Sequence, residues 1–522
     1  MGERGDTGRR GRIRGALLLL LAFATGVAPD AARADEAVEA AEAEAKAAVA
    51  EARKGLVARL VELAEWCVSV RLAGQRDRLA AEILHFDPDH AKARGWLRYT
   101  KDKAGAWVQA KGYKPPLDVT NSTQLPELAR RRAALAAEPA ALIVTTLQRL
   151  GSTLPLRRRE LILDELLRIA PDDERARAIH GDVRDGTGFV LGETKASRER
   201  RGALAEEART LLASIPEPRP ATPKPEETEF VAGGWARAYA TADLRILGAG
   251  THSSHLLARA VRLGQAARQA FPALLGHDVP EIAGLTFFLY ALPFDAYAFF
   301  DTSPRMQPSQ RAFARNLSCY WMPSGPHVLV YPNDDDTRVE WVPRIVVSGM
   351  LEGGFELGPT FGMLFEGVGV WMTTRLCGTH RTFTVRTGDY ANGQPRDEGL
   401  LGRIRANEAD WLAEARGLVS KGLRPDLRLG LGKDVNAMTA EDLVFAFALA
   451  SYLFEARPEQ VGPLLKAFPK ASLDAAVEGS LGLSVEGLEA RLVRWLEETV
   501  AAPLLPPPPP PPSNPFGPRP TK

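Results

Sequence analysis

The sequence has few cysteines, no long apolar run in its body and no excess of charge of one sign. Three cysteines among 522 residues exclude a disulfide framework. Beyond residue 34, no stretch approaches the roughly 18 to 20 apolar residues that a membrane-spanning helix needs. The 66 Lys and Arg residues nearly cancel the 65 Asp and Glu residues, so the charge supports neither nucleic acid nor an acidic membrane surface as partner. A globular protein of two or three domains is expected.

The few cysteines leave two alternatives open. Cys319 and Cys377 fall in one proposed domain and can pair in an oxidising compartment. Equally, these two residues and Cys67 can be buried, unpaired thiols. At most one disulfide bond is therefore expected.

Basic residues precede a short apolar run at the N-terminus. Arginines gather in residues 9–14 and are followed by apolar residues 16–24. An Ala-Arg-Ala sequence at residues 32–34 then offers the small-x-small cleavage site that is typical of a secretory signal peptide. We predict a signal peptide over residues 1–34 and a mature protein, beginning near Asp35, that is secreted or periplasmic. Retention of the apolar run as an anchor is the alternative; after cleavage no membrane span is expected.

Residues 35–214 have the pattern of helices, with apolar residues three and four positions apart. They contain a repeat: ILHFDPDHAKAR at residues 83–94 corresponds to LLRIAPDDERAR at residues 166–177. In each copy we expect the proline to end one helix and a neighbouring Asp to cap the next, so that two amphipathic helices fold back on each other. The first copy resembles the turn of tetratricopeptide-type repeats, which implies a mainly α helical-repeat module that binds proteins or acts as a scaffold.

Prolines mark two further segments. Residues 215–227, IPEPRPATPKPEE, hold five prolines and are predicted to form an extended linker. Residues 501–522 include seven consecutive prolines at 506–512 and are predicted to form a disordered tail.

Residues 228–500 have the pattern of strands mixed with helices. Short apolar or aromatic runs at residues 244–247, 285–292, 319–321 and 327–331 predict strands, and residues 252–271 predict an amphipathic helix.

One segment of this region, PTFGMLFEGVGVW at residues 359–371, resembles a segment of the form P-x-W-L-x-E-G-x-A-x-Y. In gluzincin metallopeptidases of the peptidase-MA type, that segment follows the HExxH helix. Together with the order of strands and helices, the resemblance covers about residues 230–500 and implies an α+β zincin-like domain. It places Glu366 at the position of the third zinc ligand.

The resemblance fails at the other metal-site positions. It places Ser348 and Gly349 where the first His and the Glu of HExxH belong, and Glu352 where the second His belongs. Residues 342–362 contain no histidine. A catalytic zinc needs three protein ligands around an open position. We therefore interpret Ser348, Gly349, Glu352 and Glu366 as vestigial positions, and expect no catalytic residue, no bound metal and no cofactor.

Three functions remain open. The first is an exported, non-catalytic pseudo-peptidase that binds a peptide or protein along an edge strand, predicted at His327, Val328, Leu329, Val330 and Tyr331. The second is a metal-dependent hydrolase with atypical ligands, in which Glu352 and Glu366, with His327 or His380, bind a metal or act as acid and base. The third is a structural protein of the cell envelope.

The eight histidines are scattered, and His252 and His255 are the closest pair. Their spacing is compatible with a shared metal ion. The helix predicted at residues 252–271 contains no acidic residue to complete a ligand set, so we interpret the two histidines as a solvent-facing helix start.

Overall fold

A computed structural model describes residues 28–118, 124–186, 188–230, 237–250, 252, 254–276, 279, 284–322, 326–384, 390–391, 394–395, 399–406 and 408–499. The chain divides into two compact units, Met1–Phe189 and Val190–Lys522, each described here by itself. Most of the predicted signal peptide and the whole proline-rich tail lie outside the described residues. Within them, every helix is too short or too polar to cross a membrane.

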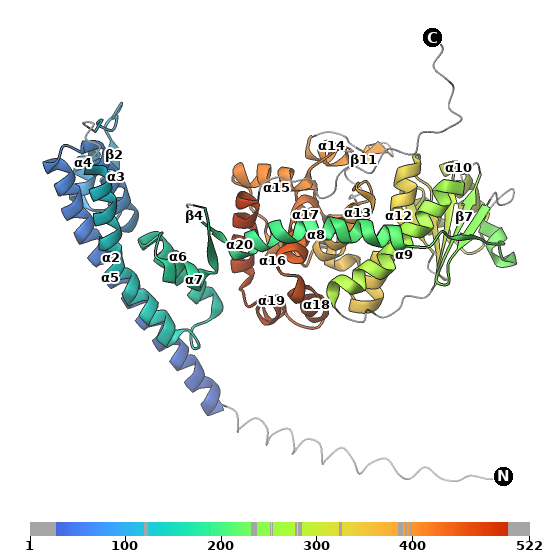
Figure 1. Cartoon of the computed structure of the whole chain (residues 1–522), viewed down its shortest axis with the longest axis horizontal. Coiled ribbons are helices and arrows are strands. Elements are labelled where there is room, and N and C mark those ends of the chain that lie inside the picture. Colours follow the sequence, from blue (N-terminus) through green and yellow to red (C-terminus); the bar gives the residue numbers. More distant parts are fainter. Residues whose placement is uncertain are drawn as a thin grey trace, which may run out of the picture. The chain divides into compact units, whose positions relative to one another are not determined.

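Four helices form the core of the first unit (Figure 1): α2 (Ala28–Ser69), α3 (Ala73–Phe86), α5 (Gln124–Leu150) and α6 (Leu156–Ile169). Helix α2 packs along α5 and α3, and α6 packs on α5 and α2. Fully buried apolar side chains from all four helices meet in this core, among them Leu60, Ile83, Ile143 and Leu166. The mainly α character predicted for this region is confirmed.

The sequence repeat appears as a structural repeat, with a different second half from the one we predicted. The first copy continues from α3 into a short helix, α4 (Ala91–Trp96), and a hairpin of β1 (Tyr99–Lys101) and β2 (Trp107–Gln109). The second continues from α6 into α7 (Glu174–His180), β3 (Asp182–Asp185) and β4 (Gly188–Leu191). The predicted order of helix, turn and second helix is present in both copies, with Asp173 as the cap of α7 but His90, not an Asp, as the cap of α4. Each second helix is short because the chain turns into a hairpin.

Equivalent contacts stabilise each copy internally. Arg94 donates from Nε to the carbonyl of Pro88 at 2.9 Å, and Arg177 donates in the same way to the carbonyl of Pro171 at 2.6 Å. Arg94 lies over the rings of Tyr99 and Trp107, and Arg177 lies over the ring of Phe189. A cation–π contact with the hairpin therefore recurs in both copies.

A six-stranded sheet organises the second unit. Its order is β5 (Arg219–Pro220), β6 (Arg237–Ala240), β7 (Leu244–Ala249), β8 (Leu285–Tyr290), β10 (His327–Val330) and β9 (Cys319–Trp321). Strands β7, β8 and β10 are parallel, whereas β6 and β9 run antiparallel to their neighbours β7 and β10. The central strands are buried on both faces, which explains their continuous apolar sequences.

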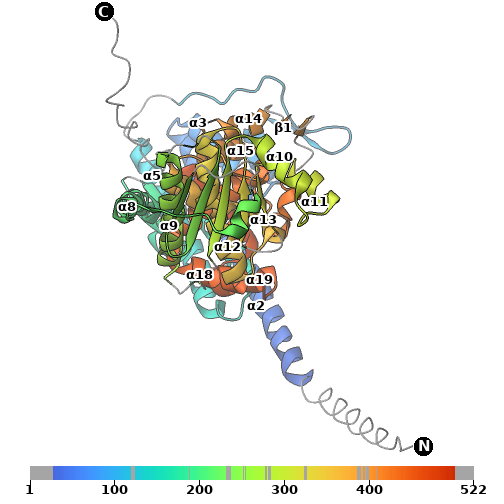
Figure 2. The ribbon, with the colours of Figure 1, turned by 90° about the vertical axis from the view of Figure 1, so that its right-hand side faces the viewer.

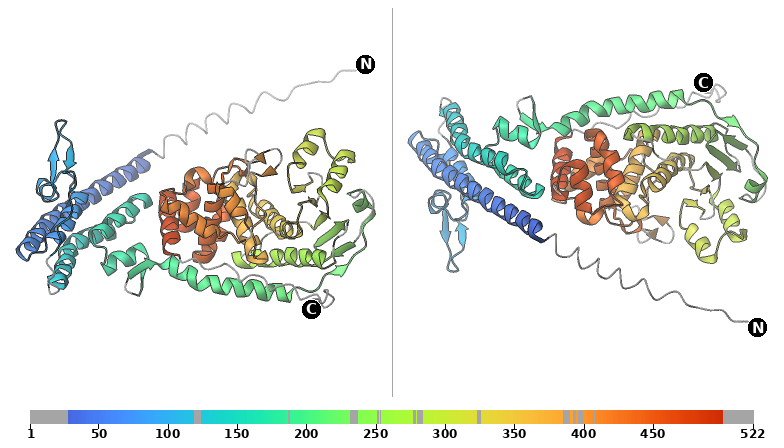
Figure 3. Two further views of the ribbon diagram at one scale, coloured as in Figure 1. Left: turned by 90° about the horizontal axis from the view of Figure 1, so that it is seen from above. Right: turned by 90° about the horizontal axis from the view of Figure 1, so that it is seen from below.

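Helices cover the two faces of this sheet. Helices α9 (Ser254–Leu275) and α12 (Asp335–Phe355) pack on the face that carries Ile246, Phe287 and Val328. Helices α10 (Pro293–Thr302) and α11 (Pro308–Ala314) pack on the other face, which carries Phe288 and Leu329. Figures 2 and 3 show the sheet between these two layers.

A helical layer follows the sheet in sequence. Helix α13 (Gly362–Cys377) packs on α12 and on α17 (Ala440–Ala456). The remaining described elements are η2 (Pro359–Phe361), β11 (Tyr390–Ala391), β12 (Gln394–Pro395), α14 (Gly399–Arg405), α15 (Trp411–Ser420), α16 (Leu427–Gly430), η4 (Val435–Ala437), α18 (Pro458–Ala467), α19 (Leu473–Leu481) and α20 (Val485–Glu498). The structure thus confirms an α+β layout with a helical N-terminal region.

The predicted boundary between the two regions is wrong. Helix α8 (Gly192–Ser214), assigned to the helical module, belongs to the second unit, where Arg201 and Ser197 both contact Glu455 of α17 at 2.7 Å. The proline-rich residues 215–227 are no linker, because they contribute β5 and begin η1 (Pro225–Phe230). Proline fits in β5 because an outer strand does not need a hydrogen-bond donor on both sides.

Candidate functional site

Helices α12 and α13 bring together Ser348 and Glu366, two of the four positions that we interpreted as vestigial. Helix α12 begins at its cap Asp334, whose side chain accepts from the N–H of Thr337. It continues without a break through Gly349 to Phe355. Ser348, Gly349 and Glu366 are all buried, and α12 packs on α13.

An arginine that the sequence pattern did not single out joins Ser348 to Glu366. Arg344, one helical turn before Ser348, donates to the Ser348 hydroxyl at 2.6 Å. Its other terminal nitrogen forms an ion pair with Glu366 at 2.8 Å, and the two side chains are only 2% and 1% exposed. A buried cation thus lies against the carboxylate that the resemblance places at the position of the third zinc ligand.

The segment after α13 satisfies the rest of the Glu366 carboxylate. Thr384 donates its backbone N–H to one oxygen at 3.1 Å and its hydroxyl to the other at 2.7 Å. Arg344 and Thr384 therefore occupy both oxygens. A buried carboxylate with such partners is a structural group, because each contact replaces hydration that it lost on burial.

The two glycines of the EGVG sequence explain how the helices approach so closely. A Cβ atom on Gly369 would lie 1.9 Å from a terminal nitrogen of Arg344. A Cβ atom on Gly367 would lie 2.3 Å from the carbonyl oxygen of Ala446 on α17. Gly369 thus makes room for the guanidinium, and Gly367 for the neighbouring helix.

A second buried carboxylate ties the same segment to α12. Glu340 accepts from the hydroxyls of Thr379 and Thr382 and from the backbone N–H of Thr382 at 2.9 Å. Its side chain is buried, and burial raises its pKa despite these hydrogen bonds. Residues 379–384 are therefore fixed by one carboxylate of α12 and one of α13. We call residues 379–384 the strap.

Glu352 does not belong to this cluster. It lies in the last turn of α12 and its side chain is exposed. No hydrogen bond or ion pair joins it to Glu366 within the described residues. The residue at the position of the second His therefore faces solvent.

The two histidines considered with the carboxylates lie elsewhere. His327 packs against the rings of Phe230 and Phe288, on the face of the sheet that α12 does not cover. His380 is buried in the strap against the edge of Trp411, and burial lowers its pKa to about 4. Across the described parts of the chain, no three His, Cys, Asp or Glu side chains are placed to share a metal ion.

The predicted binding edge is wrong. His327, Val328, Leu329 and Val330 form β10, which pairs with β8 on one side and β9 on the other, and Tyr331 follows it. The chain passes first along the outside as β9 and then returns as the inner strand β10, an order that the two short sequences do not reveal. Val328, Leu329 and Val330 are fully buried.

The remaining candidates are structural. His252 is buried and its Nε2 lies 2.8 Å from the carbonyl oxygen of Leu289, whereas His255 is exposed, so the two do not share a ligand site. Cys67, Cys319 and Cys377 are buried free thiols, in agreement with the second of the two alternatives. Burial raises the pKa of Cys67 to about 11, which disfavours the reactive thiolate.

Comparison of the sequence with protein-family models and with curated proteins finds no match.

Proposed function

We propose that this protein is a non-catalytic, zincin-like protein that is exported and acts by binding peptides or proteins. The observation that carries the proposal is the buried ion pair between Arg344 and Glu366. A zincin-type site needs a carboxylate that faces a metal and an open coordination position. Here a guanidinium neutralises that carboxylate, and the strap covers it.

The arrangement of the second unit supports the zincin-like part of the proposal. A sheet with three parallel strands and an antiparallel outer strand, β9, precedes the two helices that carry the vestigial positions. Helix α12 follows β10 directly, and α13 packs across it. This is the order in which the resemblance requires the strands, the HExxH helix and the glutamate helix.

The hydrolase alternative receives no support from the same geometry. Glu352 is exposed and Glu366 is saturated by Arg344 and Thr384. Moving Glu366 onto a metal would leave the buried Arg344 without its counter-ion, which costs several kcal/mol.

Peptide capture followed by mass measurement tests the proposal. The mature chain is immobilised and offered a mixture of peptides from an unrelated denatured protein, and the bound fraction is eluted and weighed. We expect selected peptides to be retained at their full length. Retention of cleaved peptides, with cleavage abolished by a chelator or by Glu366→Gln, contradicts the proposal, as does the absence of any retained peptide.

A further inference from the structure

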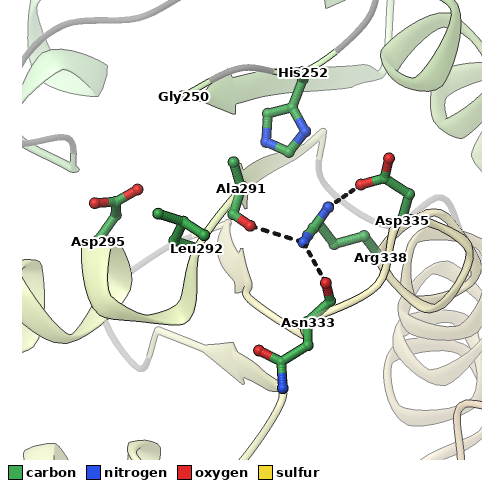
Figure 4. A pocket seen from close by; sticks show the side chains of 8 residues that line it. All are labelled: Gly250, His252, Ala291, Leu292, Asp295, Asn333, Asp335 and Arg338. Atoms are coloured by element: carbon green, nitrogen blue, oxygen red, sulfur yellow. Dashed lines mark hydrogen bonds and ion pairs between the residues drawn. The ribbon is translucent and has the colours of Figure 1, made fainter.

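A cavity of ≈ 560 Å³ opens at the carboxyl ends of the parallel strands (Figure 4). Its lining comes from the chain just after β7, β8 and β10: Gly250, His252, Ala291, Leu292, Asp295, Asn333, Asp335 and Arg338. The volume falls in the range of small-ligand sites.

The topology explains why an opening forms there. After β7 the chain passes to α9 on one face of the sheet, and after β8 it passes to α10 on the opposite face. Two neighbouring parallel strands whose connections leave on opposite faces produce a crevice at their carboxyl ends, the usual ligand position in open α/β sheets. Gly250 keeps the crevice open, because a Cβ atom there would lie 2.9 Å from the Cβ atom of Ala291 and 4.0 Å from an oxygen of Asp295.

The positive charge in the cavity is already engaged. Arg338 donates to the carbonyl oxygens of Ala291 at 2.9 Å, Pro332 at 2.9 Å and Asn333 at 3.2 Å, and it also forms an ion pair with Asp335. Its side chain is only 4% exposed. Arg338 therefore holds the loops after β8 and β10 together, and an anionic ligand would have to displace these contacts.

The negative charge is not fully engaged. Asp295 lies across the opening from Arg338 and Asp335 in Figure 4. Its carboxylate has no hydrogen bond or ion pair with any residue that the structure describes. Two carboxylates thus face one guanidinium, while burial lowers the pKa of His252 and keeps its ring neutral at pH 7. The cavity carries an excess of negative charge and suits a cationic group.

Apolar side chains flank Asp295. Leu292, which also lines the cavity, is 58% exposed, and Phe294 is 77% exposed. Exposed large apolar side chains beside a polar crevice are typical of binding surfaces. An aliphatic stem that ends in a cation matches this combination of an apolar rim and a carboxylate.

We propose that this cavity binds the basic side chain of a peptide, an arginine or a lysine, with its cation paired to Asp295 and its stem against Leu292. This inference rests on the proposed peptide-binding function and names the part of the ligand that is recognised. The site is separate from the Arg344–Glu366 pair: its residues lie after β7, β8 and β10 and in the first turn of α12, while that pair lies further along α12 and on α13.

Calorimetric titration of the full mature chain with acetylarginine amide tests the inference, with acetylcitrulline amide as the uncharged analogue. We expect the arginine compound to bind saturably within a concentration range of up to about 10 mM, and the citrulline compound to bind at least about tenfold more weakly. Asp295→Asn should weaken binding of the arginine compound by at least about tenfold as well. The matched control, Asp301→Asn, changes an exposed carboxylate that pairs with Arg315 on the same side of the sheet and should leave binding unchanged.

The same titration is made with lysine amide acetylated only on its α-nitrogen, which keeps its ammonium, and with the analogue acetylated on both nitrogens, which has no side-chain cation. Absence of saturable binding of both cationic compounds, equal binding of a cationic compound and its uncharged analogue, or an Asp295→Asn variant that binds like the wild type overturns the inference. These outcomes are independent of the proposed function, which the capture of intact peptides judges separately.

Discussion

Arg344 determines the chemistry of the vestigial site. Its guanidinium lies between Ser348 and Glu366, and Gly369 provides the space for it. Glu366 could be singled out from the EG segment, and the absence of histidine from residues 342–362 could be read from the sequence. Arg344 was not, because its partner lies on another helix and a single arginine in an apolar helix carries no sequence signal.

The Arg344–Glu366 ion pair predicts that a single substitution at Glu366 lowers the stability of the fold strongly. Glu366→Gln leaves the buried Arg344 without a counter-ion, and we expect the free energy of unfolding to fall by about 3–5 kcal/mol. The measurement is urea unfolding followed by tryptophan fluorescence. Glu352→Gln, on the exposed end of α12, is the control and should change stability by less than about 0.5 kcal/mol.

A double variant separates a structural pair from a functional one. Replacing both partners with apolar residues, Arg344→Met with Glu366→Leu, should recover most of the stability lost in Glu366→Gln. Equal stability of Glu366→Gln and the wild type would show that the pair does not hold α12 to α13.

The buried His380 predicts a pH dependence. Its pKa is lowered from 6.5 to about 4, chiefly by burial, so the folded protein binds this proton less tightly than the unfolded chain does. The neutral, buried ring therefore contributes up to about 3 kcal/mol to the free energy of unfolding. This contribution is complete above pH 6.5 and is lost as the pH falls toward 4.

We expect His380→Gln to remove this part of the pH dependence, whatever its effect on stability at pH 7. The measurement is the difference between the unfolding free energies at pH 7 and pH 4.5, compared between variant and wild type. His255→Gln, which changes an exposed histidine in α9, should leave that difference unchanged. An unaltered difference in His380→Gln would contradict the burial of this ring.

At the scale of elements, patterns along the chain predicted the type of most segments but not their partners. The runs at residues 285–292 and 327–331 are strands, as expected. The position of β10 between β8 and β9 depends on pairing between segments distant in sequence, and apolar content is equally compatible with an edge or a centre. The same limit applies to α8, whose helical pattern is clear but whose contacts with α17 are set by tertiary packing.

The assignment of α8 to the second unit is testable by truncation. Glu455 is fully buried, its charge is balanced by Arg201 of α8, and it also accepts a hydrogen bond from the Ser197 hydroxyl. A chain of residues 190–499 should fold, whereas a chain of residues 216–499 should lose its near-ultraviolet circular dichroism, because it exposes the apolar face of α17 and leaves Glu455 unpaired.

A point variant supports the same conclusion without truncation. Arg201→Met should destabilise the full chain by about 3–5 kcal/mol, and Arg209→Met, which breaks an exposed ion pair of the same helix, by less than about 1 kcal/mol. Equal near-ultraviolet circular dichroism spectra of the two truncated chains would contradict the assignment of α8 to the second unit.

At the scale of the whole molecule, composition and patterning predicted an α+β protein with a helical N-terminal region. The repeat at residues 83–94 and 166–177 was visible in the sequence, because a proline, a cap and an arginine recur at fixed spacing. The hairpins that follow each copy of the repeat were not visible in the sequence, because strands of three or four residues give too few positions for an alternating pattern. The cavity at the sheet's carboxyl edge was equally hidden, because it arises where segments from three strands meet.

We propose that a buried ion pair, Arg344 with Glu366, stands where a zincin-like protein would hold its metal. The measurement that tests this proposal is the metal content of residues 35–522, determined by plasma mass spectrometry after purification without chelator and incubation with zinc. We expect far less than one zinc per chain, and the same value for Glu366→Ala. Near-stoichiometric zinc in the wild type that disappears in Glu366→Ala would contradict it.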